Sequence, residues 1–73
     1  MMTYGQRQIL TYLAKHATAG AQDTAWIAEA CGHWYDTPWA STRLKTLKKH
    51  GLVDNRAKGS WIITDAGLRD VEV

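Results

Sequence analysis

The sequence predicts a small, mostly helical α+β domain, with three helices, a two-stranded β-hairpin and a short helix at the end. Three observations support this fold class. Apolar residues recur with helical spacing in the first half of the chain. A Thr-Pro pair then begins a third helix that a glycine ends. After that glycine the pattern changes to β-branched and aromatic residues around a Gly-containing loop. With 73 residues and neither linker nor repeat, the chain is expected to form a single domain over residues 1–73.

The first helix is expected over residues 3–17. Ile9, Leu10 and Leu13 recur there at the spacing of one helical face, so they should point into the core. The hydroxyl of Thr3 can cap the helix start by accepting a backbone N–H.

The second helix is short and is expected from Thr24 to Cys31. Asp23 or Thr24 would serve as its N-cap, and Gly32 would stop it. Free cysteines are among the most buried residues, so Cys31 is expected to be a small core residue at the helix end.

The third helix is expected over residues 37–50. The hydroxyl of Thr37 can satisfy an orphan backbone N–H, and Pro38 at the first helical position loses no hydrogen bond. Gly51 supplies the left-handed residue that ends many helices. Residues spaced by four and three share one face, and those expected to point inward are Ala40, Leu44 and Leu47.

A β-hairpin and a last short helix are expected after this point. Residues 52–56 and 60–64 are β-branched or aromatic enough for strands, and the loop 57–59 contains a glycine. A final helix over 65–71 would follow, with Asp65 where the helix dipole favours negative charge.

Positive charge is concentrated in the second half of the chain. The net charge is only +2, but residues 37–60 hold six basic residues and one acidic residue, a balance of +5. The remaining residues have a balance of −3. A basic half beside an acidic half would orient the domain in the field of a polyanion. The alternative is that the basic residues form a solvated face with no function.

Three sequence phrases, in order, resemble the winged helix-turn-helix fold. Residues 24–32, T-A-W-I-A-E-A-C-G, are similar to the T-x-x-[IL]-A-x-x-x-G pattern of the first helix of that motif. Residues 43–53, R-L-K-T-L-K-K-H-G-L-V, resemble the R-L-x-x-L-x-x-x-G-L-[VI] ending of many recognition helices. Residues 61–67, W-I-I-T-D-A-G, resemble the aromatic-x-[LI]-T-x-x-G phrase that closes the wing in regulators of the MarR and PadR kind. Together the phrases cover nearly the whole chain, whereas the segment 32–37 is longer and more aromatic than the turn in those families.

The resemblance implies a three-helix core with the hairpin 52–64 as the wing. It also implies sequence-specific binding of double-stranded DNA, with helix 37–50 in the major groove. Such a chain would be a small transcriptional regulator or a DNA-binding protein of the phage or plasmid type. Side chains outside the buried face would contact bases or phosphates, and hairpin cations would contact the backbone or a minor groove. The candidate DNA-binding residues are Thr37, Trp39, Ser41, Thr42, Arg43, Lys45, Thr46, Lys49, Arg56 and Lys58.

The aromatic residues suggest a second hypothesis about function. Trp26 and Trp61 are expected in the core. Trp34, Tyr35 and Trp39 flank the start of the basic helix, and we expect them to pack as a small cluster under the turn. The alternative is an exposed patch that binds a protein partner. In that case the chain would be a winged-helix protein-interaction module, with a solvated basic face.

The sequence favours neither an enzyme nor a metal or cofactor site. Cys31 and His33 form a C-x-H pair, but zinc needs four ligands in definite spacing. No third group orients a Cys–His nucleophile, and neither a phosphate-binding Gly loop nor paired catalytic carboxylates are evident.

A cytoplasmic protein is expected from what the sequence lacks. No apolar run approaches the roughly 18 residues of a membrane span. The first residues carry no signal-peptide stretch, and one cysteine fits a reducing compartment. A membrane is therefore not an expected partner. The expected partner is double-stranded DNA, and a weak homodimer or a protein partner is also possible.

Overall fold

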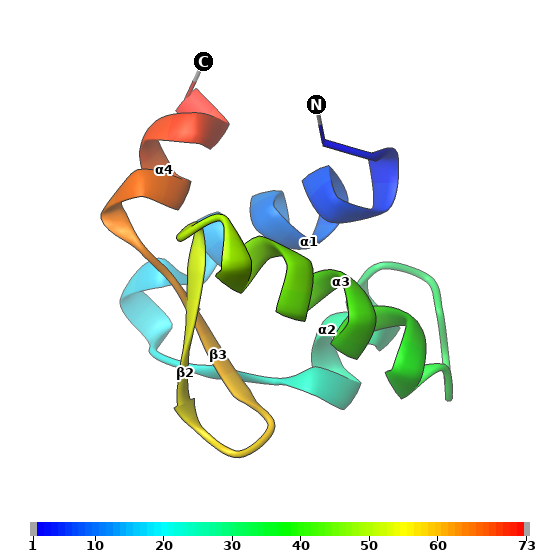
Figure 1. The fold of residues 1–73 in the computed structure, drawn as a ribbon. Coiled ribbons are helices and arrows are strands. Elements are labelled where there is room, and N and C mark those ends of the chain that lie inside the picture. The colour runs from blue at the N-terminus through cyan, green and yellow to red at the C-terminus, as the bar shows by residue number, and fades with distance from the viewer. Residues whose placement is uncertain (1, 73) are drawn as a thin grey trace.

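Three helices enclose the core, and a small sheet and a fourth helix complete the molecule (Figure 1). The computed structural model describes residues 2–72. The elements are α1 (Tyr4–Lys15), the 3₁₀ turn η1 (Ala17–Ala19), β1 (Gln22–Asp23), α2 (Thr24–Ala30), α3 (Thr37–Lys49), β2 (Val53–Ala57), β3 (Ser60–Ile63) and α4 (Asp65–Glu72). In Figure 1 the β2–β3 hairpin projects to one end of the molecule, and both ends of the described chain lie at the other. The predicted order of three helices, a hairpin and a short helix is confirmed.

The core forms where the apolar faces of α1, α2 and α3 meet the sheet. The apolar residues predicted to point inward from α1 and α3 are all buried, which confirms the helical phase derived from their spacing. Cys31 is buried at the end of α2, as predicted. The core residues are Ile9, Leu10, Leu13, Ile27, Ala28, Cys31, Ala40, Leu44, Leu47, Val53, Trp61 and Ile63.

The helix caps are partly as predicted. Thr3 forms a complete capping box with Gln6, because each side chain accepts a backbone N–H from the other residue. At α3 the prediction is wrong by one position: Asp36 is the N-cap, and its carboxylate accepts the N–H of Trp39 at 3.2 Å. Thr37 is therefore the first helical residue and Pro38 the second, where a missing N–H is also harmless.

The sheet has a third strand that the sequence did not predict. β1 pairs antiparallel with β3, so the strand order is β1-β3-β2. Gln22 lies opposite Trp61 and Asp23 opposite Ser60. Two polar residues carry no β-strand signal of their own, and only the tertiary pairing makes them a strand.

The junction between the wing and α4 explains the Thr-x-x-Gly phrase. The Thr64 hydroxyl donates to the carbonyl of Gly51 at 2.7 Å and accepts the N–H of Gly67 at 3.1 Å, which caps α4. A Cβ at Gly67 would clash with the carbonyl oxygen of Leu52. Only glycine allows α4 to pack this closely on the root of the hairpin.

Two predictions about aromatic residues are wrong. Trp61 is buried as predicted, but Trp26 is 66% exposed because α2 buries Thr24, Ile27 and Ala28 on its opposite face. The proposed cluster under the turn does not form either: Trp34 is 61% and Tyr35 99% exposed. Tyr35 also has a φ of 62°, a left-handed conformation that is uncommon for residues other than glycine.

Candidate nucleic-acid interface

The outward face of α3 carries short polar and basic side chains. Ala40, Leu44 and Leu47 are fully buried, so the opposite side of the helix faces solvent. The predicted residues on that side are Thr42, Lys45, Thr46 and Lys49. The hydroxyl of Thr46 donates to the carbonyl of Thr42 at 3.2 Å, which leaves its lone pairs to accept from a ligand.

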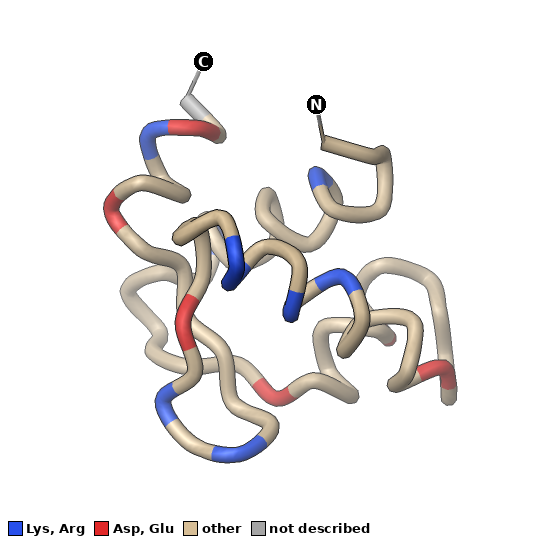
Figure 2. The backbone as a smooth tube through the Cα atoms, in the orientation of Figure 1, with Lys and Arg blue, Asp and Glu red and all other residues tan. Residues whose placement is uncertain are grey.

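A hollow of about 450 Å³ separates the next flank of α3 from the wing. Ser41, Lys45 and Lys48 line it from the helix, and Asn55 and Lys58 line it from the hairpin. The Lys48 ammonium group donates to the Asn55 amide oxygen, which joins the helix to β2. Figure 2 shows basic positions along α3 and around the tip of the hairpin.

Hydrogen bonds from Thr24 connect the residues at the floor of the hollow. Thr24, at the start of α2, donates to the carbonyl of Gly59 both from its backbone N–H at 2.9 Å and from its hydroxyl at 3.0 Å. The same hydroxyl accepts the indole N–H of Trp61 at 2.9 Å. These bonds fix the tip of the wing on the N-terminus of α2, although the two segments are 35 residues apart in sequence.

The other flank of α3 faces α1 and is packed. The ring of His33 stacks on Trp39 with centroids 3.6 Å apart and an angle of 9° between the planes. The Arg43 guanidinium lies over the Trp39 ring, 4.7 Å from the ring centroid, and donates to the Trp39 carbonyl at 3.1 Å. Both residues are predicted DNA contacts. A methyl group at Gly5 of α1 would lie 2.7 Å from Arg43 Nε. Trp39 and Arg43 are therefore half-buried against α1, away from the hollow.

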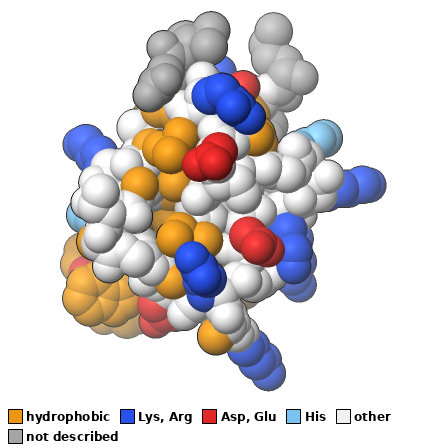
Figure 3. All heavy atoms as spheres, turned by 90° about the vertical axis from the view of Figure 1, so that its left-hand side faces the viewer, with side chains coloured by type: hydrophobic (Ala, Val, Ile, Leu, Met, Phe, Trp, Pro, Cys, Tyr) orange, Lys and Arg blue, Asp and Glu red, His pale blue; other side chains and the backbone are white. Residues whose placement is uncertain are grey.

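The remaining predicted residues lie at the two ends of this surface. Thr37 is exposed at the start of α3, and Arg56 and Lys58 are exposed on the hairpin. Figure 3 shows basic side chains projecting from the α3 edge and from the hairpin end of the molecule, with acidic side chains among them. The hairpin also carries the acidic Asp54, whose carboxylate accepts the N–H of Asn55 at 2.9 Å.

Among the polar side chains that line the hollow from α3 and β2, sequence reasoning missed Lys48 and Asn55. The spacing of Lys48 from Ser41 and Lys45 already placed the three on one flank of a helix, and that signal was available. The position of Asn55 could not be found in this way, because it depends on how the hairpin meets α3.

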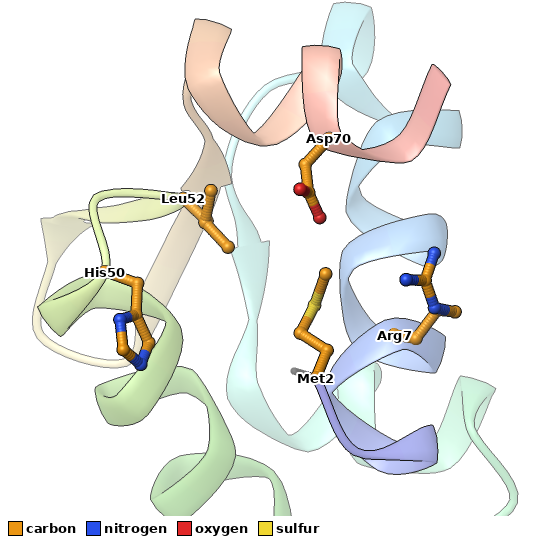
Figure 4. A pocket seen from close by; sticks show the side chains of 5 residues that line it. All are labelled: Met2, Arg7, His50, Leu52 and Asp70. Atoms are coloured by element: carbon orange, nitrogen blue, oxygen red, sulfur yellow. The ribbon is translucent and has the colours of Figure 1, made fainter. Parts of the chain in front are cut away.

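A second hollow lies where α1, α4 and the end of α3 meet (Figure 4). It measures about 310 Å³, and its lining includes Met2, Leu52 and Asp70. In Figure 4 the Asp70 carboxylate and Met2 point toward each other across it, and the Asp70 Oδ2 atom is buried with no hydrogen-bond partner among the described residues. Arg7 and His50 also line the hollow, so the mixed charges favour no single class of ligand.

Neither metal-binding nor membrane-spanning features occur in the described chain. Among residues 2–72, no three His, Cys, Asp or Glu side chains converge as metal ligands. Burial raises the pKa of the Cys31 thiol, which keeps it protonated and a poor metal ligand at neutral pH. Within the same residues, no helix is both long and apolar enough to cross a membrane.

A helix-turn-helix formed by α2 and α3, followed by a hairpin and packed on α1, defines a winged-helix fold. One solved structure with this fold is that of MepR, a transcription regulator of the Staphylococcus aureus multidrug efflux pump MepA. The similarity has a TM-score of 0.83 at 25% sequence identity and covers 97% of this chain. The chain spans about half (53%) of the length of that regulator.

Comparisons by sequence gave no match: neither a protein-family model nor a curated protein matches the chain. The predicted winged helix-turn-helix fold, similar to that of MarR-like regulators, is confirmed by the structural similarity. The matched protein is a transcription regulator, which agrees with the expectation that this chain is not an enzyme.

Proposed function

We propose that residues 1–73 form a single unit that binds double-stranded DNA sequence-specifically, as a small cytoplasmic transcriptional regulator or a phage- or plasmid-type DNA-binding protein. The proposal rests on the outward face of α3. Thr42, Lys45 and Lys49 stand on it without acidic neighbours on the same helix, and the basic hairpin lies beside it. A helix of this kind fits the major groove, where hydroxyl groups can bond base edges and ammonium groups can bond guanine or phosphate.

The two flanks of α3 would then have different roles. Ser41 and Lys45 lie toward the wing and would contact bases or the adjacent backbone. Arg56 and Lys58 on the hairpin would contact the backbone or a minor groove. Thr37 and Thr46 would supply hydroxyl groups near the groove, whereas Trp39 and Arg43 would act mainly by holding α3 on α1.

The test is selection of bound duplexes from a random library, followed by affinity measurements over a range of salt concentrations. We expect one enriched sequence, and a binding constant that falls steeply as salt rises because cations are released from the phosphates. A random duplex should bind more weakly, with a similar salt dependence. Absence of binding to any duplex at low salt would refute the proposal. Sedimentation of the complex would tell whether one or two copies bind, and so whether a homodimer forms on DNA.

A second candidate function is favoured by the exposed aromatic residues. Trp34 and Tyr35 lie open to solvent in the turn, and Trp26 of α2 is exposed as well. These side chains could contact a protein partner, because aromatic residues are enriched at interfaces. Acrylamide quenching of the wild type and of Trp34→Phe, with and without the selected duplex, separates the two functions. Protection of Trp34 by DNA would place the turn on the duplex. If DNA binds but the quenching of Trp34 does not change, the aromatic residues remain available for a protein partner. If no DNA binds, the result favours the protein-interaction module alone.

A further inference from the structure

Three lysine side chains from two separate elements line the hollow between α3 and the wing. Lys45 and Lys48 come from α3, and Lys58 comes from the hairpin turn. No acidic side chain is among the described residues that line this hollow. Two carboxylates lie next to lining residues: that of Asp54 accepts the N–H of Asn55 at 2.9 Å, and that of Asp23 lies beside Gly59 at the edge of the floor. Three cations around one hollow repel each other, and an anion between them would relieve that repulsion.

The hollow is also fixed before any ligand arrives. Thr24 holds the wing tip through two hydrogen bonds to the Gly59 carbonyl, and Lys48 joins α3 to β2 through Asn55. A ligand that enters would therefore order few groups, and little binding free energy would be lost to ordering. The Asn55 amide oxygen is occupied by Lys48, so its NH₂ group remains as a donor toward an oxygen ligand.

The geometry of a duplex indicates which anion would be present. If α3 lies in the major groove and the wing reaches the adjacent minor groove, one sugar–phosphate strand separates the two grooves. That strand must cross the gap between helix and wing, and the hollow occupies this gap. Phosphodiester oxygens suit lysine, which binds phosphate as a point charge, and also suit neutral donors such as Ser41 and Asn55.

We infer that this hollow binds one phosphodiester group of the DNA backbone, held jointly by Lys48 of the helix and Lys58 of the wing. The inference rests on the proposed DNA binding and deepens it, because it adds Lys48 and Asn55 to the interface and assigns two distant residues to one phosphate. Lys45, at the boundary between the hollow and the outward face, can bind either the same phosphate or a base edge.

The first measurement compares Lys48→Ala with Lys49→Ala on the selected duplex. Both lysines are exposed neighbours in the last turn of α3, so the two variants change net charge and helix dipole equally. We expect Lys48→Ala to weaken binding roughly tenfold at moderate salt and to lower the salt slope by about one. Lys48→Gln, which keeps the stem and loses the charge, should behave in the same way, and circular dichroism would check that each variant folds.

The deciding measurement replaces single phosphates of the duplex with neutral methylphosphonates. For the wild type, one replacement between the major-groove site and the wing should weaken binding. Lys48→Ala and Lys58→Ala should both become insensitive to that same replacement, whereas Lys49→Ala should remain sensitive. The inference is overturned if the two hollow variants lose sensitivity at different phosphates or at none. If the wild type binds no duplex at all, the proposed function itself fails, and this result is distinct from the others.

Discussion

The two flanks of α3 use their positive charge in different ways. On the flank that faces α1, Arg43 lies over Trp39 and donates to the Trp39 carbonyl. On the flank that faces the wing, Lys45 and Lys48 line an open hollow. The first arrangement holds a cation within the protein's own packing, and the second leaves cations available to a ligand.

A count of basic residues on a helix therefore says little about binding. Arg43 and Lys45 are two positions apart in sequence, yet they lie on opposite flanks because successive residues turn by about 100°. What decides their role is the element that each flank meets, α1 in one case and the hairpin in the other.

The hydrogen bonds of Thr24 beneath the wing-facing flank should contribute most to stability. Thr24→Val keeps the shape of the side chain and removes the hydroxyl that accepts the Trp61 indole N–H and donates to Gly59. A buried donor is left unpaired, so we expect the free energy of unfolding to fall by about 2–3 kcal/mol. Urea denaturation measures it. Thr11→Val, at an exposed position of α1, is the matched control and should change stability by less than about 0.5 kcal/mol. Equal stabilities of the two variants would contradict the assigned role of Thr24.

The next largest loss of stability is expected when the packing of the α1-facing flank is removed. Trp39→Ala removes the ring that lies between His33 and Arg43. Loss of a half-buried aromatic contact and of the cation–π contact should lower the free energy of unfolding by roughly 2 kcal/mol. Thermal unfolding provides the measurement, and Trp34→Ala is the control because Trp34 is exposed. If both tryptophans prove equally dispensable, the packed flank does not contribute as described.

The two flanks of α3 should also differ in how much each contributes to DNA affinity. Lys45→Ala should weaken binding to the selected duplex about tenfold, because its ammonium group is free to contact DNA. Arg43→Ala should weaken binding only about twofold, since its guanidinium is engaged by Trp39. Fluorescence anisotropy gives both constants. A larger loss for Arg43→Ala would mean that the stack opens on DNA and that both flanks contact the duplex.

The sequence predicted what depends on local spacing. The buried face formed by Ala40, Leu44 and Leu47 was found because helical periodicity alone determines it. The same helical periodicity indicates that Trp26 is exposed, because Thr24, Ile27 and Ala28 define the buried face of α2. That prediction failed because the size of the indole ring was given more weight than the phase of the helix.

The hollow itself could not be predicted from the sequence. Its floor depends on the bond from Thr24 to Gly59, and its rim on the bond from Lys48 to Asn55. Each bond joins elements whose relative position is set by the packing of the whole core, and no local pattern encodes it. The same holds for β1, whose residues Gln22 and Asp23 become a strand only through β3.

The substitution Gly5→Ala should change stability least, and it tests how firmly Arg43 is held on the α1-facing flank. In Gly5→Ala, the new methyl group would lie 2.7 Å from Arg43 Nε and 3.1 Å from a ring carbon of Trp39. The tip of Arg43 is flexible and can move away, so the change in the free energy of unfolding should stay within about 0.5 kcal/mol. The same substitution in an Arg43→Ala background meets no guanidinium and should be more favourable by a few tenths of a kcal/mol. A double-mutant cycle by urea denaturation measures this coupling, and the ¹⁵Nε resonance of Arg43 should shift in Gly5→Ala. No coupling and no shift would mean that Arg43 is not held against Gly5 in solution, and the contrast between the two flanks would then depend on Trp39 alone.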